Sequence, residues 1–326
     1  MSSHLTLEDR YYIKAQRDTG VSIEKIAKRL KVHKSTISRE LNRNRGNRGY
    51  RPKQAQRKAS ERWREAAKAI KMTSELRAFI AARIRQDWSP EQITGRLKRE
   101  GGECISHERI YQFIGEDKAS GGDLWTHLRW SHIQRRKRYG KHDRRGEIKG
   151  RRSIEKRSRK VKKRKRIGDL ERDLVIGTNH KGALLTFVDR KSRMSFAVKV
   201  NTKSAKEVHQ ATLKIMRPLK TILSTITNDN GKEFASHKKT EKRLRVKIYF
   251  THPYSSFERG TNENTNGLIR QYFPKKKTDF RKVKSREITT MNKKLNSRPR
   301  KCLGYKTPLE VFKKELRKMK NVAFVT

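Results

Sequence analysis

Residues 227–234, TNDNGKEF, decide the fold, because they end a short apolar run with a turn signature that carries Asp229. A second polar stretch, ERGTNENTNGLIR at residues 258–270, opens a helix and places Glu263 with 33 residues between it and Asp229. Upstream, Asp173 lies in another short apolar run. Three carboxylates from separate elements can hold two Mg²⁺ ions, so a metal-dependent site is the first hypothesis.

The elements around these stretches follow a definite order from Ile167, where the composition changes. The first three elements are strands in a hairpin meander. A helix capped by Ser204 follows, and then come a fourth strand, a second helix and a fifth strand. The predicted strands cover residues 173–177, 184–189, 194–200, 222–227 and 246–250, and the helices cover 204–216 and 232–244. This order is typical of a ribonuclease-H-like α/β fold, so residues 167–326 are predicted to form a catalytic domain with C-terminal helices.

The charge of the chain indicates a nucleic-acid partner. Lys and Arg number 86 against 33 Asp and Glu, which gives a net charge of +53 over 326 residues. Such a surface binds phosphate backbones through counterion release, so double-stranded DNA is the expected partner. A ribosome-associated basic protein carries a similar charge but has no need of spaced carboxylates.

The two cysteines and the hydropathy argue against several classes of protein. Cys104 and Cys302 lie far apart with no CxxC pair, which argues against a disulfide scaffold and a zinc module. No charge-free run approaches the ~20 residues of a membrane span, and residues 1–4 do not open a signal peptide. We therefore expect no membrane partner, and a nucleoid-associated protein in a reducing cytoplasm.

Residues 1–45 are predicted to form a helix-turn-helix domain. A helix capped near Thr6 runs to Asp18, a second covers 23–30, and a third covers about 34–43 after a tight turn. Short polar groups and cations on the outer face of the third helix suit base edges and phosphates. These candidate DNA-binding residues are Lys34, Ser35, Thr36, Ser38 and Arg39. A purely structural three-helix bundle is the alternative.

The middle of the chain divides into three further segments. Residues 46–72 are predicted to be a basic arm and helix that either tracks the phosphate backbone or links the domains. Residues 73–134 repeat the helical order, with Ser89 and Pro90 opening one helix and His107 and Arg109 on another as candidate DNA contacts. A bundle that only packs on the catalytic domain is the alternative. Residues 135–166 hold 19 Lys and Arg against 3 acids and predict an interdomain linker.

Each proposed metal ligand has neighbours that compete with it. Asp173 on the first strand is the candidate that bridges two ions, Asp229 follows the fourth strand, and Glu263 reaches in from the last core helix. Other carboxylates nearby offer the same chemistry or have structural uses. They are Asp169, Glu171, Asp189, Glu233 and Glu258.

At the level of motifs, the chain resembles the bacterial insertion-sequence transposases of the "thirty" family. The resemblance rests on TNDNGKEF and four longer stretches, and it spans most of the chain. These are HKSTISREL at 33–41, WSPEQITGRLKREGGECISHERIYQFI at 88–114, ERGTNENTNGLIRQYFPK at 258–275 and RPRKCLGYKTPLEVF at 298–312. Two family motifs differ here: Leu170-Glu171-Arg172-Asp173 stands for Trp-Glu-Gly-Asp, and Phe257-Glu258-Arg259-Gly260 for Trp-Gln-Arg-Gly. The stretch 156–166, of mixed charge in the family, is almost wholly basic.

The resemblance implies an integrase-type DDE core with Asp173, Asp229 and Glu263 as the catalytic and metal-binding triad. It further implies two Mg²⁺ ions, with Mn²⁺ as a substitute, and a helix-turn-helix region that binds terminal inverted repeats. Copy-out or cut-and-paste movement of a DNA element follows, and we expect a homo-oligomer on DNA. A non-catalytic DNA-binding regulator with a decayed core is the alternative. A phage- or retroelement-type integrase is a third possibility, but the chain lacks the N-terminal zinc-binding pattern of that class.

Overall fold

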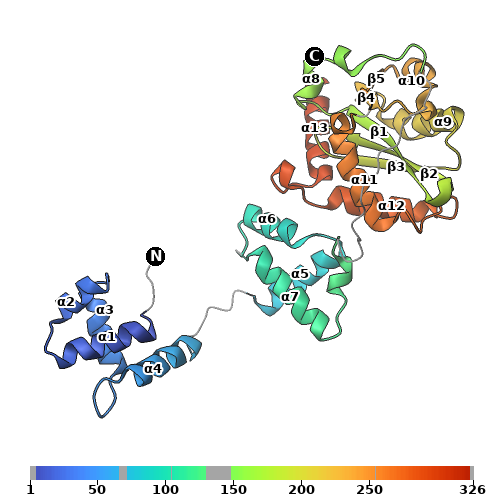
Figure 1. Ribbon diagram of the computed structural model, residues 1–326. Helices are drawn as coiled ribbons and strands as arrows, with labels where there is room; N and C mark the ends of the chain where they lie inside the picture. The colour runs from blue at the N-terminus through green and yellow to red at the C-terminus, as the bar shows by residue number, and fades with distance from the viewer. Residues whose placement is uncertain (1–4, 66–71, 104, 130–147, 254, 324–326) are drawn as a thin grey trace. The chain divides into compact units, whose positions relative to one another are not determined.

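A computed structural model describes residues 5–65, 72–103, 105–129, 148–253 and 255–323 (Figure 1). The chain forms two compact units, Met1–Ile70 and Lys71–Thr326. No helix in these ranges is long and apolar enough to cross a bilayer.

The first unit contains the three predicted helices and a fourth. They are α1 (Leu7–Asp18), α2 (Ile23–Arg29), α3 (Lys34–Asn44) and α4 (Pro52–Glu65). Thr6 and Asp9 form a capping box at the start of α1, and Ser22 caps α2, as their residue types predict. Small and branched side chains from α1, α2 and α3 form the core, which is Ile13, Ile26, Ala27 and Ile37. The helix-turn-helix prediction is confirmed.

A buried ion pair holds the first unit together. Arg10 Nε donates to Glu40 Oε1 at 2.7 Å, and the Tyr50 hydroxyl donates to the same oxygen at 3.1 Å. Ala55 of α4 is fully buried, and Arg62 donates to the Arg43 carbonyl at 3.0 Å. The basic helix of residues 46–72 therefore packs on the helix-turn-helix over its described length.

The second unit begins with three more helices, α5 (Ser74–Arg85), α6 (Pro90–Glu100) and α7 (His107–Ala119). Ser89 and Gln92 form a capping box with Pro90 at the first helical position, as predicted, and Gly101 ends α6 with a φ of 73°. Apolar side chains from all three helices share one core, including Ile80, Ile93 and Ile110.

The same unit contains a five-stranded sheet of order β3-β2-β1-β4-β5. β2 pairs antiparallel with both β1 and β3, whereas β4 and β5 run parallel to β1. The strands are β1 (Asp169–Ile176), β2 (Ala183–Asp189), β3 (Ser195–Val200), β4 (Thr225–Asn228) and β5 (Lys247–Phe250). This topology confirms the predicted ribonuclease-H-like α/β class.

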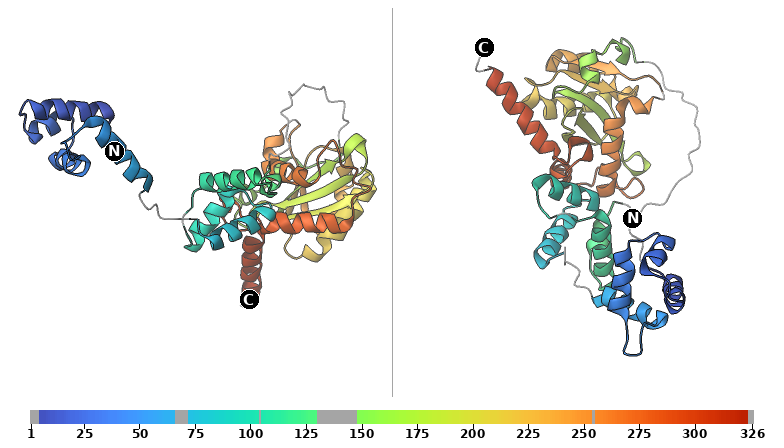
Figure 2. Two further views of the ribbon diagram at one scale, coloured as in Figure 1. Left: turned by 90° about the horizontal axis from the view of Figure 1, so that it is seen from below. Right: turned by 90° about the vertical axis from the view of Figure 1, so that its left-hand side faces the viewer.

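Helices cover both faces of the sheet (Figure 1). One face packs against α9 (Ala205–Met216) and α10 (His237–Leu244), and the other against α11 (Gly260–Tyr272) and α12 (Ser285–Ser297). The last helix, α13 (Pro308–Ala323), packs Phe312 edge-on against Phe196, and its C-terminal end projects outward (Figure 2). Because residues alternate along a strand, neighbours such as Leu174 and Val175 enter different cores.

Three elements differ from the predictions. The fourth strand begins at Thr225 rather than Ile222. The first strand begins at Asp169 rather than Asp173, because residues 169–171 pair with β4. The predicted helix 232–244 divides into a 3₁₀ turn, Lys232–Phe234, and α10, since the chain must bury Phe234 before the helix starts.

The described part of the predicted linker also packs on this unit. Ile148 belongs to the core of the sheet, and Phe250 N donates to the Arg152 carbonyl at 2.8 Å, beside a parallel bridge from Ser153. Val161 is fully buried. Residues 135–147 lie outside the described residues, but residues 148–166 contribute to a core instead of forming a spacer.

The α5–α7 bundle contacts the helices next to the sheet. Asp87 accepts hydrogen bonds from Lys294 at 2.7 Å and from the Tyr272 hydroxyl at 2.9 Å. Arg96 makes two hydrogen bonds of 2.8 and 2.9 Å with the Glu310 carboxylate on α13. The bundle therefore packs on the catalytic domain, and DNA contacts by His107 and Arg109 stay a prediction.

Candidate active site

The sheet topology brings two of the three predicted carboxylates to one place. Asp173 lies in the middle of β1, and Asp229 directly follows β4, which pairs in parallel with β1. The two residues are 56 positions apart in the sequence, and the strand pairing makes them neighbours. Both side chains are partly exposed, at 22% and 30%.

One guanidinium group joins the two aspartates. Arg259 Nη1 lies 3.3 Å from Asp173 Oδ1, and Arg259 Nη2 lies 3.2 Å from Asp229 Oδ2. The same Nη1 donates to the Arg172 carbonyl at 3.2 Å. A buried cation thus lies where two carboxylates converge. The two aspartates are therefore placed to bind one cationic group together.

An amide from α11 orients the first aspartate. Asn266 Nδ2 donates to Asp173 Oδ2 at 2.8 Å, and the Thr186 hydroxyl donates to Asn266 Oδ1 at 3.1 Å. The backbone N–H of Leu174 donates to Asp173 Oδ1 at 2.9 Å. Sequence reasoning missed Arg259 and Asn266 as site residues, although both stand in the quoted stretch 258–270.

The third predicted ligand, Glu263, lies on α11 nearly one turn before Asn266. Its side chain is exposed and makes no hydrogen bond or ion pair with the described residues. Across the described ranges, no three His, Cys, Asp or Glu side chains cluster closely enough to hold a metal ion. The structure therefore brings Asp173 and Asp229 together without Glu263.

Electrostatics mark Glu233 as a further carboxylate close to the pair. Burial raises the pKa of Glu233, and the charges of Asp229 and Asp173 raise it further. Burial also raises the pKa of Asp173; Arg259 opposes this shift, and Asp229 adds to it. A bound cation would relieve the repulsion among these carboxylates. Carboxylate oxygens are also the hard ligands that Mg²⁺ prefers.

The other competing carboxylates are engaged in structural contacts. Asp169 accepts from Arg166 at 2.9 Å, and Glu171 accepts from the backbone N–H of Asn262 at 2.9 Å. Asp189 accepts backbone hydrogen bonds from Gly168, Lys191 and Ser192 rather than pairing with an arginine. Glu258 binds His252 at 2.8 Å. These contacts leave Asp173 and Asp229 as the carboxylates that Arg259 binds, with Glu233 close enough to both aspartates for their charges to raise its pKa.

The candidate DNA-binding residues of the first unit lie on α3. Lys34 and Arg39 are exposed, and Lys34 Nζ donates to Glu24 at 3.1 Å. The hydroxyl of Ser35 lies 2.8 Å from His33 Nδ1, at the cap of the helix. Thr36 and Ser38 are half-buried. The inward residue is Ile37, so the polar residues surround the solvent side of this helix.

The two candidates of the α5–α7 bundle lie in the first turn of α7. His107 is exposed, and Arg109 donates to Glu116 Oε1 at 2.7 Å. Arg109 is therefore held along its own helix by a neighbouring carboxylate.

Comparisons with known proteins show which proteins this chain is similar to. The profile of a helix-turn-helix domain matches residues 2–44, and that of an integrase core domain matches residues 165–256. The transposase for insertion sequence element IS4351 of Bacteroides fragilis is 44% identical, over 100% of both chains. Transposase InsI for element IS30A of Escherichia coli (strain K12) is 38% identical, over 96% of this chain and 84% of its own length. The catalytic core domain of BIV integrase, a solved structure, is 17% identical over 47% of this chain and 98% of that chain, with a TM-score of 0.38.

Proposed function

Because this chain belongs to the IS30 family of insertion-sequence transposases, we propose that Asp173 and Asp229, with Glu263, are its catalytic metal ligands. The protein is a DNA transposase, with a helix-turn-helix that binds DNA and an integrase core that transfers nucleotidyl groups. The observation that carries the proposal is the Arg259 guanidinium held between the two aspartates.

The donor set fits Mg²⁺. Asp173 and Asp229 offer carboxylate oxygens that already share one cationic group, and Glu263 is an exposed carboxylate on the adjacent helix. Bound Mg²⁺ activates an oxygen nucleophile and stabilises the leaving oxygen in a phosphodiester reaction.

The surrounding residues orient these ligands. Asn266 and the backbone N–H of Leu174 each bind one oxygen of Asp173, which fixes the plane of its carboxylate. Arg259 balances the charge of both aspartates, and a bound metal ion would supply positive charge to the same carboxylates.

Recognition belongs to the helical front of the chain. The outer face of α3, with Arg39 and Lys34, enters the major groove of the terminal inverted repeats. Cleavage and strand transfer then use water and a DNA 3′-hydroxyl as nucleophiles. Two element ends require at least two copies of the chain, so the active form is a homo-oligomer on DNA, working at the nucleoid in the cytoplasm.

The test compares Asp229→Ala and Glu263→Ala with a matched control, Asp279→Ala. Asp279 is an aspartate outside the site that pairs with Arg281 at 2.9 Å. Both site variants should lose strand transfer in Mg²⁺ by a factor of at least ~10³ while retaining binding to the element ends, and the control should keep both activities. Normal joining by either site variant would refute the triad. End binding without metal-dependent cleavage by the wild type would instead favour a DNA-binding regulator.

A further inference from the structure

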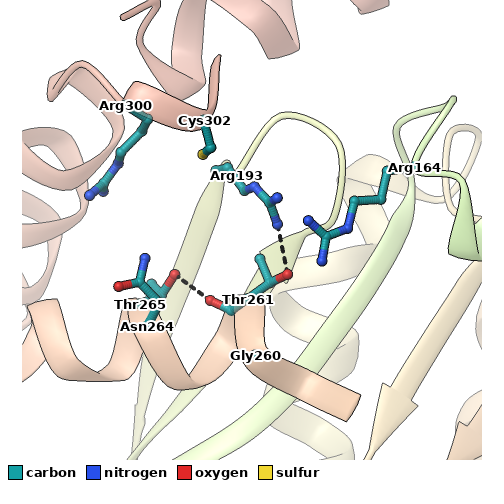
Figure 3. A pocket seen from close by; sticks show the side chains of 8 residues that line it. All are labelled: Arg164, Arg193, Gly260, Thr261, Asn264, Thr265, Arg300 and Cys302. Carbon is teal, nitrogen blue, oxygen red and sulfur yellow. Dashed lines mark hydrogen bonds between the residues drawn. The ribbon is translucent and has the colours of Figure 1, made fainter. Parts of the chain in front are cut away.

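A cavity of about 240 Å³ lies beside the first turns of α11 (Figure 3). Its lining comes from four segments: the chain after α8 (Arg159–Lys162), the β2–β3 turn, the N-terminal half of α11 and the 3₁₀ turn Lys301–Leu303 with the residue before it. The lining residues are Arg164, Arg193, Gly260, Thr261, Asn264, Thr265, Arg300 and Cys302. Three of them are arginines, and none is an acid.

The arginines of this cavity are bound only to neutral groups. Arg193 Nη1 donates to the Thr261 hydroxyl at 2.7 Å, and Arg300 Nη2 donates to the Leu295 carbonyl at 3.0 Å. The Nε atoms of both are buried and have no hydrogen-bond partner among the described residues. The Arg164 side chain makes no hydrogen bond or ion pair within the described part of the chain, and it extends toward Thr261 (Figure 3).

The cost of gathering these charges appears in their titration. Burial lowers the pKa of Arg164, and the neighbouring guanidinium groups of Arg193 and Arg190 lower it further. Burial lowers the pKa of Arg300 to about 10, and Arg298 adds to that shift. No acid lines the cavity to offset these positive charges, so a bound anion would relieve their repulsion.

We propose that this arginine cavity binds a backbone phosphate of DNA. Planar guanidinium groups recognise phosphate oxygens through paired N–H donors. Those of Arg164 and Arg193 approach each other beside Thr261, whereas Arg300 lines the same cavity with its guanidinium turned away from them (Figure 3). The lining helix, α11, also carries Asn266, which binds Asp173. DNA held in the cavity is thereby tied to the element that orients the catalytic aspartates. This site rests on the proposed function only in that the anion belongs to the DNA substrate.

Cys302 allows a direct test, because it is exposed and lines the cavity. The sequence has two cysteines, so Cys104→Ser leaves Cys302 as the single thiol of the full chain. This protein is mixed, in EDTA, with element-end duplexes that each carry one tether on a chosen backbone phosphate. The tether ends in a mixed disulfide, so the Cys302 thiolate attacks the tether sulfur and releases a small thiol. Disulfide formation should be confined to a few adjacent phosphates and should vanish with Cys302→Ser.

The matched variants are Arg164→Glu and Lys163→Glu, which reverse the charge of two adjacent exposed residues. Arg164→Glu should reduce the yield at the preferred phosphates about tenfold or more, because it removes a charge-assisted hydrogen bond worth about 1.5–3 kcal/mol. Lys163→Glu should leave the pattern unchanged. Evenly spread disulfides, none at all, or equal yields from both variants would overturn the proposal.

The two proposals fail separately. Disulfide formation in EDTA requires no chemistry on DNA, so a confined pattern stands even if the wild type shows no strand transfer. Strand transfer that depends on Asp229 and Glu263, with no preferred phosphate at Cys302, would leave the catalytic proposal intact and exclude the cavity as a DNA site.

Discussion

Arg172 Nε donates to Asn228 Oδ1 at 2.9 Å, and each of these residues directly precedes one of the two paired aspartates. The Arg172 side chain is fully buried and points to the opposite face of the sheet from Asp173, because neighbouring residues alternate along a strand. It also donates to Thr212 at 2.9 Å and stacks over Phe234 at 4.4 Å. Arg172 stands at the glycine position of the Trp-Glu-Gly-Asp motif. Its hydrogen bond to Asn228 links β1 to β4 on the face of the sheet opposite Asp173.

Arg172→Ala should destabilise the second unit strongly. The variant loses a large buried side chain and leaves the oxygens of Asn228 and Thr212 without the hydrogen bonds that Arg172 donates. We expect a loss of about 3–5 kcal/mol in the free energy of unfolding, measured by denaturant titration. Lys163→Ala, an exposed change, should stay within about 0.5 kcal/mol. An equally small effect for Arg172→Ala would contradict the buried tie.

Arg259→Gln should make stability depend more steeply on Mg²⁺. Without the guanidinium, Asp173 and Asp229 repel each other, so we expect a loss of about 1–3 kcal/mol in EDTA. Mg²⁺ should restore much of it, since the ion supplies the missing positive charge. The measurement is the melting temperature in EDTA and in Mg²⁺. Arg281→Gln, which leaves the site untouched, serves as the control, and an identical Mg²⁺ response in both variants would exclude the bridging role.

The contact between the α5–α7 bundle and the catalytic helices should weaken in acid. Burial alone would raise the pKa of Asp87, but hydrogen bonds from Lys294, His127 and Tyr272 outweigh it and lower that pKa. The folded pKa therefore lies below the unfolded value of about 3.9, so this stabilisation is present above pH ~4 and is lost as pH falls through the folded pKa.

Melting temperatures of the wild type and Asp87→Asn between pH 3 and pH 7 check this expectation. The gap between them should be widest near neutral pH and should close toward pH 3. Glu103→Gln, in an exposed loop, should run parallel to the wild type throughout. A gap that is constant with pH would mean that ionisation of Asp87 does not stabilise the contact.

Arg39→Ala should weaken binding to the element ends, because Arg39 is an exposed cation on the outer face of α3. If it reads a base, we expect a loss of about 1–3 kcal/mol for the element end and little change for a scrambled duplex. Gel-shift titrations with both duplexes provide the measurement. Lys14→Ala on α1 is the control, and equal losses from the two variants would count against recognition by α3.

Local signals in the sequence determined the elements of this protein. Caps such as Thr6, Ser89 and Ser204 satisfy the first N–H groups of their own helices, so they act within three or four residues and are visible in the chain itself. Alternating apolar runs and the turn at Asp229 revealed the strands and their order. The sequence also pointed to Asp173 and Asp229, since each stands in or directly after a strand.

Only the tertiary structure decided which side chains meet. Glu171 and Asp189 looked as suitable as Asp173, but their partners, Asn262 and Gly168, come from other parts of the chain. Arg259 reaches both aspartates, and Arg164, Arg193 and Arg300 share a cavity, because the parallel β1–β4 pairing and the packing of α11 bring distant segments together. Such contacts depend on strand register and helix placement, which no local pattern encodes.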